Sequence, residues 1–412
     1  MASSVLPSES PGRLRAALGG LALVALALAA VRLAGRYLNS PTVPRPIDFL
    51  QVWSAGRLHL AGENPYDPAR MYDLQRANRL PDDRASMMWN PPWALALVVP
   101  LGALPVNAAQ VVWLAGLLAL VVASALVLWH LAGGSRERRW VPVVAALAFA
   151  PTWFLLVGGQ IVGLMLFGVV GFLLASRANR PLLAGACVAL TAVKPHLFVP
   201  LAVGLLIDAT RSPSGRRVVL GGLLALGFAS ILATIPNPGV WEQYLAGTTG
   251  AGSEQHKSLT DWVNPTVGAW VRAQLPGRPF WVQWVPTVLA AAGFGAYWWR
   301  GGAPGKWSVA MPLVIPLGLL TAPYGSWMCD QVLLLVALVP VLAWWEAAPG
   351  ASRRVRPAVA VYALANVAAL ALMVRATSQE HYVWFAPVIV GCLAWTAHRL
   401  AEPCETPSPV GA

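Results

Sequence analysis

The segment 108–131, AAQVVWLAGLLALVVASALVLWHL, decides the fold class, because it contains no Asp, Glu, Lys or Arg. About 20 predominantly apolar residues in a helix cross the hydrocarbon core of a bilayer, which is about 30 Å thick. The segment therefore predicts a transmembrane helix. Seven further apolar segments predict spans in the same way: 15–37, 217–236, 280–299, 307–323, 328–346, 357–374 and 382–399.

The composition agrees with this prediction. Of the 412 residues, 57% are apolar and 11% are charged, whereas a soluble domain is about 45–50% apolar and about 25% charged. This excludes a soluble enzyme, a disordered chain and a nucleic-acid-binding domain as descriptions of the whole chain. The net charge of +12 does not change the conclusion, because the basic residues are spread among apolar segments and form no basic face.

Between residues 141 and 208 the apolar sequence is divided into four shorter segments: 141–157, 161–176, 182–193 and 195–208. Gly158-Gly159-Gln160 and Lys194-Pro195 are two of the breaks. Together with the longer segments they predict twelve crossings. The predicted fold class is an all-α polytopic membrane protein, with one membrane domain over 1–400 and a disordered cytoplasmic tail over 401–412.

Charge placement predicts the orientation. With a cytoplasmic N-terminus, the predicted cytoplasmic segments hold more than half of the 29 Lys and Arg residues, including the cluster at 136–139. This is the bias that the positive-inside rule expects. It requires that 91–105, a proline-bounded apolar run too short for a comfortable span, does not cross. Two long loops, 38–90 and 237–279, then lie on the outer face.

The first outer loop contains two predicted helices. Residues 47–60 predict a short amphipathic helix, and Asp67-Pro68 supplies an N-cap carboxylate and an N1 proline for a second helix that runs to about Arg79. Such helices beside a span are typical of a lipid interface, with Met71 against lipid. The alternative is a solvated cap over the bundle.

Asp48 is the first candidate for chemistry. It follows the first predicted span by about ten residues and opens the helix predicted at the outer surface. A carboxylate there can deprotonate a hydroxyl at the mouth of a membrane cavity. The alternative is a helix N-terminal charge that interacts with the helix dipole, worth less than about 1 kcal/mol.

Lys194-Pro195-His196 interrupts two apolar segments. A lysine and a histidine at membrane depth are costly unless they face a cavity or a partner, and a lysine beside a broken helix can bind a phosphate as a point charge. The alternative is a lysine that snorkels to the outer interface. Gln160 lies at the same predicted depth, where interhelical hydrogen bonding explains it equally well.

Two further polar clusters are predicted near the outer face. His256-Lys257, close to Asp261, can close over a bound headgroup or remain a solvated part of the loop. Asp330-Gln331 lies at the outer end of an apolar run, and an acidic residue there is expected to face inward. Asp330 either shapes the site or pairs with the lysine of the broken segment.

Several kinds of site have no sequence signal. The histidines show no HxxxH or HxxE pattern and the four cysteines show no CxxC pair, so no metal site is predicted and the cysteines are expected to be packing residues. No Walker motif is present, and no GxGxxG opens a βαβ unit, which argues against nucleotide-driven chemistry. No cofactor is expected.

Taken in order, the polar landmarks resemble glycosyltransferase family 87, a set of bacterial polytopic transferases with the so-called C-type fold. The matching pieces are Asp48-Phe49 with Trp53, AGENPYDP over 61–68, Trp89-Asn90-Pro91-Pro92, Gly159-Gln160, Lys194-Pro195 and the Pro323–Trp327 turn. They span 48 to 331, most of the chain. One departure is that family members often carry histidines after this turn, where the present chain has Met328-Cys329-Asp330.

The resemblance implies transfer of a sugar, typically mannose, from a polyprenyl-phosphate donor to a lipid or glycan acceptor on the outer face of the cell membrane. The implied site residues are Asp48 as catalytic base; Lys194, His196, His256 and Lys257 at the donor phosphate; and Tyr66, Asn90, Gln160, Trp327, Asp330 and Gln331 as further lining. A departing phosphate needs no proton, since its second pKa is about 6. One base and one cation therefore suffice, and an in-line displacement inverts the anomeric centre.

A multi-pass transporter or lipid flippase is the main alternative, because broken apolar segments with polar residues also occur in transporters. Transporters often show related halves, whereas the Asp48 loop and Lys194-Pro195 have no second copy. The candidate residues also collect at one predicted face rather than at the midplane. A non-catalytic scaffold is a third possibility, and it predicts that substitution of Asp48, Lys194 and Asp330 changes nothing.

Overall fold

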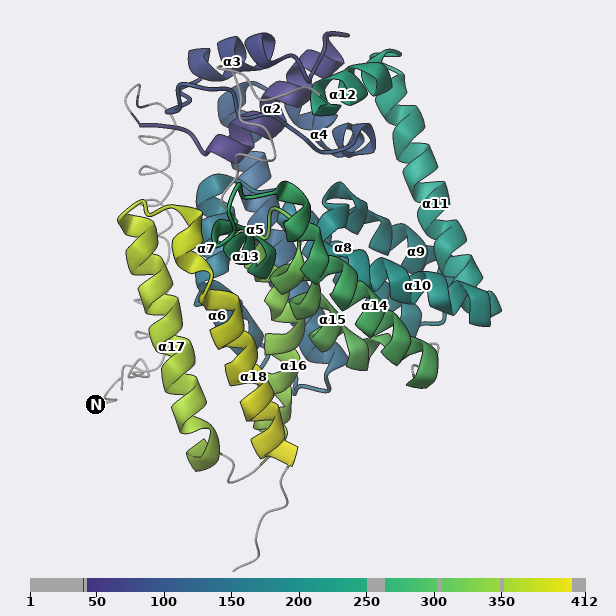
Figure 1. The fold of residues 1–412 in the computed structure, drawn as a ribbon, viewed down its shortest axis with the longest axis vertical. Coiled ribbons are helices and arrows are strands. Elements are labelled where there is room, and N and C mark those ends of the chain that lie inside the picture. The colour runs from purple at the N-terminus through teal and green to yellow at the C-terminus, as the bar shows by residue number, and fades with distance from the viewer. Residues whose placement is uncertain (1–39, 41–42, 250–263, 302–305, 349–351, 402–412) are drawn as a thin grey trace, which may run out of the picture. The chain divides into compact units, whose positions relative to one another are not determined.

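The computed structural model describes residues 40, 43–249, 264–301, 306–348 and 352–401, and every regular element among them is a helix (Figure 1). All of these helices belong to the compact unit Pro46–Ala412. The all-α fold class is therefore confirmed. The first predicted span, 15–37, and residues 402–412 of the predicted tail lie outside the described residues.

The helices follow in this order: α2 (Ile47–Leu60), α3 (Pro68–Ala77), α4 (Leu95–Gly102), α5 (Val106–Leu131), α6 (Trp140–Leu147), α7 (Ala150–Gly158), α8 (Val162–Arg177), α9 (Pro181–Val188), α10 (Val199–Arg211), α11 (Pro213–Thr234), α12 (Val240–Thr249), α13 (Val267–Ala273), α14 (Trp284–Gly301), α15 (Trp307–Thr321), α16 (Leu335–Ala347), α17 (Ser352–Val374) and α18 (Phe385–Ala401). Short 3₁₀ turns join several of them, notably Ala189–Val193 and Asp330–Leu334.

Within the described part of the chain, five helices are long and apolar enough to cross a membrane: α5, α11, the stretch Asp330–Ala347 that ends in α16, the Val355–Val374 part of α17, and Gln379–Ala401, which ends in α18. A sixth is added if α6 and α7, which meet at 64°, form one span. Helices α8 and α15 are apolar but shorter. The membrane character is thus confirmed, and the full set of twelve crossings stays a prediction.

The segment 141–157, predicted as one apolar segment, contains a bend that was not predicted from its sequence. It forms α6 and α7, separated at Ala148 and Phe149. Pro151 follows the bend and cannot donate a backbone hydrogen bond to the preceding turn. The free N–H of Ala150 is instead bound by Asn366 of α17, whose Oδ1 accepts it at 2.7 Å. A contact across more than 200 residues therefore fixes the bend.

The two predicted interfacial helices are packed into protein. Helix α2 buries Phe49 but also Ser54 and His59 on other sides, so it presents no continuous face to lipid. Met71 of α3, expected against lipid, is fully buried, and that expectation is wrong. Helix α3 does begin as predicted, with the Asp67 carboxylate accepting two backbone N–H groups of the first turn. The burial favours a cap over the bundle.

Helix α2 is fixed by a close crossing with α4, and Figure 1 shows both at the same end of the unit as α3 and α12. A Cβ on Gly102 would lie 2.3 Å from the carbonyl carbon of Gly56, so the crossing requires glycine at this contact. The indole of Trp53 donates to the Leu104 carbonyl at 3.1 Å, and Arg57 donates to the Gly102 carbonyl at 3.1 Å. These contacts set the position of the N-terminus of α2, which carries Asp48.

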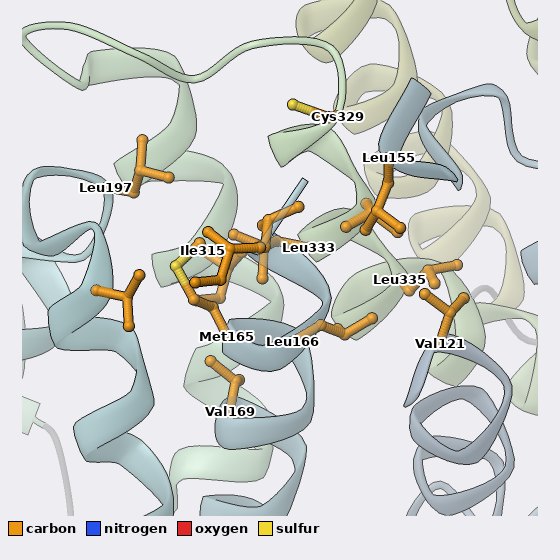
Figure 2. Close-up of a cluster of buried hydrophobic side chains, with 14 of the residues drawn as sticks. Val121, Leu155, Met165, Leu166, Val169, Leu197, Ile315, Cys329, Leu333 and Leu335 are labelled. Atoms are coloured by element: carbon orange, nitrogen blue, oxygen red, sulfur yellow. The ribbon is translucent and has the colours of Figure 1, made fainter. Parts of the chain in front are cut away.

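The apolar core packs against the segments that carry the candidate residues. Figure 2 shows Met165 and Leu166 of α8, Ile315 of α15 and Leu333 together in this cluster, with Cys329 and Leu197 nearer one edge. Cys329 directly precedes Asp330, and Leu197 directly follows His196. The core therefore supports the segment that carries Asp330 and the segment that carries Lys194 and His196.

Candidate active site

Four polar side chains from distant parts of the chain form one connected group: Asp48, Gln160, Lys194 and Asp330. We call it the outer cluster, after the face on which the sequence predicts these residues. The Lys194 Nζ lies 2.7 Å from the Asp330 Oδ1 and 3.1 Å from the Gln160 Oε1. The Gln160 side chain also hydrogen-bonds the Asp48 carboxylate. The sequence left open whether Asp330 pairs with Lys194, and the structure shows the ion pair.

Asp330 is the counter-ion of the group. Its side chain is fully buried, with Oδ1 on the Lys194 ammonium and Oδ2 accepting the backbone N–H of Trp327 at 2.9 Å. A buried carboxylate is tolerated when it is paired and hydrogen-bonded. Both oxygens of Asp330 are engaged, so this carboxylate holds the ammonium in place, and Asp48 is better suited to accept a proton from a ligand.

Lys194 follows a 3₁₀ turn whose last carbonyl groups are held from another segment. Asn90 Nδ2 donates to the Val193 carbonyl at 2.8 Å, and the indole of Trp93 donates to the Ala192 carbonyl at 3.2 Å. The Tyr66 hydroxyl donates in turn to the Asn90 carbonyl at 3.1 Å. Tyr66 and Asn90, expected to line the site, therefore support the backbone from which the lysine projects.

The ammonium of Lys194 retains capacity for a ligand. An ammonium carries three N–H donors, and the contacts to Gln160 and Asp330 use two of them. The side chain is 12% exposed, whereas that of Asp330 is not exposed at all. A negatively charged ligand that reaches the cluster can therefore meet the ammonium without displacing its counter-ion.

Gly158 and Gly159 make room for Asp48. A Cβ on Gly158 would lie 2.8 Å from the Asp48 Oδ2, and a Cβ on Gly159 would lie 2.7 Å from the Cβ of Phe49. Gly159 also adopts a left-handed conformation, with φ of 73°, which favours glycine. Its carbonyl accepts the buried indole N–H of Trp113 at 2.7 Å. The Gly-Gly pair thus lets α2 and the end of α7 approach closely enough for Gln160 to bind the carboxylate.

The electrostatics of Asp48 suit a general base. Burial raises the pKa of this carboxyl to about 6, while the charge of Lys194 and the hydrogen bond from Gln160 act in the opposite direction. A base works best when its pKa lies near the working pH, because it is then ionised yet still binds a proton well. At neutral pH the Asp48 carboxylate is mostly ionised and ready to accept one.

The turn before Asp330 is strongly constrained. Gly325 and Ser326 both have positive φ, 71° and 53°. The Gln331 Nε2 donates to the carbonyl and the hydroxyl of Ser326, at 3.2 and 3.0 Å. The ring of His196 lies against that of Tyr324, with 4.0 Å between centroids and 34° between the ring planes, and a Cβ on Gly325 would lie 2.8 Å from the His196 Nε2. The turn therefore fixes both the Asp330 side of the cluster and the histidine.

The predicted residues thus divide into three groups. Asp48, Gln160, Lys194 and Asp330 form the outer cluster, while Tyr66, Asn90, His196, Trp327 and Gln331 belong to the segments packed around it. His256, Lys257 and Asp261 lie outside the described residues. The prediction that no metal is bound remains an expectation; the part of the chain that the structure describes holds no group of three His, Cys, Asp or Glu suited to a metal ion.

Sequence reasoning missed three supporting residues. Trp93 and Trp113 hold carbonyl groups next to Lys194 and Gln160, and Gly158 leaves space for the Asp48 carboxylate. Only the glycine gave a signal, since a Gly-Gly pair that ends an apolar segment suggests close backbone approach. The two tryptophans are indistinguishable in sequence from the many others of this chain.

The outer cluster combines a carboxylate that can accept a proton with an ammonium that can stabilise negative charge, and one glutamine links the two. The model of glycosyltransferase family 87 matches residues 89–323, more than half of the chain, and this range includes Asn90, Gln160 and Lys194 but not Asp48 or Asp330. No curated protein and no solved structure matches the chain. The extent of the family match and the apolar spanning helices lead to one conclusion: the chain belongs to glycosyltransferase family 87 and is a membrane glycosyltransferase.

Proposed function

We propose that this glycosyltransferase moves a hexose, mannose in the first instance, from a polyprenyl-phosphate donor to a hydroxyl group of a lipid or glycan acceptor. The reaction takes place at the extracytoplasmic face of the cell membrane, in a chain that crosses it twelve times. The observation that carries the proposal is the connection of Asp48 to Lys194 through Gln160. It joins the two groups that such a transfer needs.

In the proposed reaction the acceptor hydroxyl gives its proton to the Asp48 carboxylate while its oxygen attacks the anomeric carbon. The bond from that carbon to the phosphate oxygen breaks, and its electron pair leaves with the polyprenyl phosphate. Attack opposite the leaving group inverts the anomeric centre. The departing phosphate monoester needs no proton at neutral pH, so the reaction requires no general acid.

Lys194 is proposed to bind the donor phosphate and to stabilise the negative charge that develops as the bond breaks. Asp330 and Gln160 keep the ammonium in place before the donor arrives. His196, two residues along the chain, is proposed to complete the phosphate contacts together with His256 and Lys257 of the second outer loop. Membership in the family favours this transferase over the transporter or flippase alternative.

The test is a transfer assay on the purified protein, with labelled polyprenyl-phosphate mannose as donor and extracted membrane lipids as acceptor. Replacing Asp48 by Asn keeps the size of the side chain but removes the proton acceptor, so the rate is expected to fall by about 10²- to 10⁴-fold. Asp73→Asn is the control, because Asp73 is an exposed carboxylate of α3. If the Asp48→Asn protein were as active as the parent, Asp48 would not be the general base.

The same assay separates the parts of the proposal. Transfer from another polyprenyl-phosphate hexose but not from mannose corrects the sugar and keeps the mechanism. A product that retains the anomeric configuration rules out single displacement. Movement of labelled lipid across the membrane without a new glycosidic bond favours the flippase alternative.

A further inference from the structure

We infer that a patch of arginines at the end of α5 remote from α2 binds the phosphodiester headgroups of anionic phospholipids. Two loops form the patch, one between α5 and α6 and the other between α8 and α9. We call it the arginine patch, and its members are all exposed: Arg136, Arg138, Arg139, Arg177 and Arg180. Such binding does not depend on the proposed transfer reaction.

The first loop is held against the end of α5. The indole of Trp129 donates to the Ser135 carbonyl at 2.9 Å, and a Cβ on Gly134 would lie 2.2 Å from the same indole. Ser135 is also bound by Glu346 of α16, with its hydroxyl 2.6 Å from Oε1 and its backbone N–H 3.3 Å from Oε2. The three arginines that follow therefore project from a turn that several contacts hold in place.

The second loop lies beside the first. The Arg177 Nη1 donates to the Leu131 carbonyl at 3.0 Å, so this guanidinium sits at the last turn of α5. Asn179 then adopts a left-handed conformation with φ of 53°, and the Arg180 N–H donates to the Ala175 carbonyl at 2.9 Å, which ends α8. Both loops therefore present arginines at the same end of the α5 and α8 pair.

Much of the charge of the patch is not neutralised by the residues that the structure describes. Arg138 forms an ion pair with Glu346, with 3.4 Å between Nε and Oε1. The other acidic residue of the two loops, Glu137, is exposed. Three side chains of the patch have neither an ion pair nor a hydrogen bond within the described ranges: Arg136, Arg139 and Arg180. Guanidinium groups bind phosphate oxygens through two parallel hydrogen bonds, so a phosphodiester suits this patch.

Exposed tryptophans place the patch at a membrane surface. Trp140 directly follows Arg139 and is 60% exposed, and Trp344 in the last turn of α16 is 47% exposed. Indole rings concentrate at the level of lipid headgroups, because they have an apolar body and one N–H donor. Val144, one turn further along α6, is exposed as well, which suits hydrocarbon. Arginine, tryptophan and valine thus follow the order of headgroup, interface and hydrocarbon, which favours a lipid over a soluble anion.

The length of α5 separates the patch from α2 by about one membrane thickness. The helix has 26 residues, which corresponds to about 39 Å, compared with about 30 Å for a hydrocarbon core. Just before its first turn the Leu104 carbonyl binds Trp53 of α2, and its last turn binds Arg177. Figure 1 shows α2 at the upper end of the unit and α6 well below it. Anionic lipid at the patch therefore sets the height of the bundle in the bilayer, with α2 at the opposite surface.

The test is a competition between dioleoyl-phosphatidylglycerol and dioleoyl-phosphatidylcholine, added in equal and excess amounts to the full chain in detergent. Mass spectrometry measures the ratio of the two lipids that co-purify with the protein. The parent is expected to retain more of the anionic lipid. Replacing Arg136, Arg139 and Arg180 together by Gln is expected to lower the ratio by about tenfold, because each arginine near the headgroups attracts the anionic lipid.

The matched control removes three exposed arginines near α3, at the other end of α5: Arg70→Gln, Arg76→Gln and Arg84→Gln. Its net charge equals that of the patch variant, and its lipid ratio is expected to stay near that of the parent. Replacing the three patch arginines by Lys keeps the charge and is expected to keep most of the preference. If the Gln variant does not fold, Arg180→Glu alone replaces it, with a fall in the ratio again expected.

A patch variant that keeps the ratio of the parent overturns the inference, and so does an equal fall in the control, since net charge alone would then explain the binding. A parent that retains both lipids equally overturns it as well. Release of the anionic lipid by inorganic phosphate at constant ionic strength would assign the patch to a soluble anion, and co-purification of nucleic acid in place of lipid would assign it to a polyanion. Both results contradict the inference, whatever the outcome of the transfer assay.

Discussion

Asp208 and Asp330 are both buried aspartates at the ends of apolar segments, yet their surroundings differ. Each oxygen of Asp208 accepts one indole N–H at 2.8 Å, from Trp298 and from Trp307. Asp330 instead holds an ammonium that also contacts Gln160 and lies near a second carboxylate, that of Asp48. Both oxygens of Asp208 thus accept a hydrogen bond from a neutral donor.

The difference shows that burial of a carboxylate does not by itself mark a site. Asp208 joins α10 to α14 and α15 through uncharged donors, which suits a structural role. The outer cluster contains an ammonium with a remaining donor beside two carboxylates, so it can respond to a ligand. Chemistry is therefore expected in the outer cluster and stability at Asp208.

Lys194→Met is the test of the outer cluster with the largest expected effect on transfer rate and stability together. Loss of the ammonium is expected to lower the transfer rate by about 10²- to 10³-fold and to leave Asp330 buried without a cation, which costs about 3–5 kcal/mol of stability. Adding Asp330→Asn should restore the stability and not the rate. Transfer assays and thermal unfolding of both variants measure this, and recovery of the rate in the double variant contradicts the role of the lysine.

Gly158→Ala tests the space around Asp48. The added Cβ would lie 2.8 Å from the Asp48 Oδ2, so the carboxylate must move, and the rate is expected to fall by about 10²-fold. Gly227→Ala in α11 is the matched control, because nothing lies within 4 Å of its added Cβ. Equal transfer rates for the two alanine variants would contradict the prediction that the rate depends on the position of the Asp48 carboxylate.

Asp208→Asn is expected to have the smallest effect on transfer. The amide still accepts one indole N–H, but its NH₂ group faces the other, so a buried donor loses its acceptor at a cost of about 1–3 kcal/mol. Thermal unfolding should occur at lower temperature while the transfer rate stays near that of the parent. If Asp208→Asn lowered the transfer rate as much as Asp48→Asn, the distinction between a structural Asp208 and a catalytic outer cluster would be wrong.

Local sequence signals predicted much of the fold. The N-cap at Asp67, the long apolar helices and the break at Lys194 each follow from a few adjacent residues, and the structure contains all three. The bend after α6 and the burial of α2 depend on partners far away in sequence, Asn366 in one case and Gly102 in the other. No periodicity within the segment itself encodes such contacts.

The candidate site shows the same limit. Residue type and membrane depth singled out Lys194 and Asp330, because charge is costly in apolar segments. Asp48 was singled out by its place at the start of a predicted helix soon after the first predicted span. Their connection runs through Gln160, which a linear sequence could not separate from an ordinary interhelical amide. The supporting hydrogen bonds from Trp93 and Asn90 likewise need the fold, since each reaches about 100 residues along the chain.

The proposed mechanism requires the Asp48 carboxylate, beside Lys194 and Gln160, to accept the proton during transfer. The pH dependence of kcat/KM tests it most directly, because the raised pKa of Asp48 predicts a tenfold fall per pH unit below about 6 and a plateau above. Gln160→Leu removes a hydrogen bond that favours the ionised form, so its acid limb should move to higher pH, whereas that of Asp208→Asn should not move. A parent profile without a limb near this pH, or one that Gln160→Leu leaves in place, would contradict the claim.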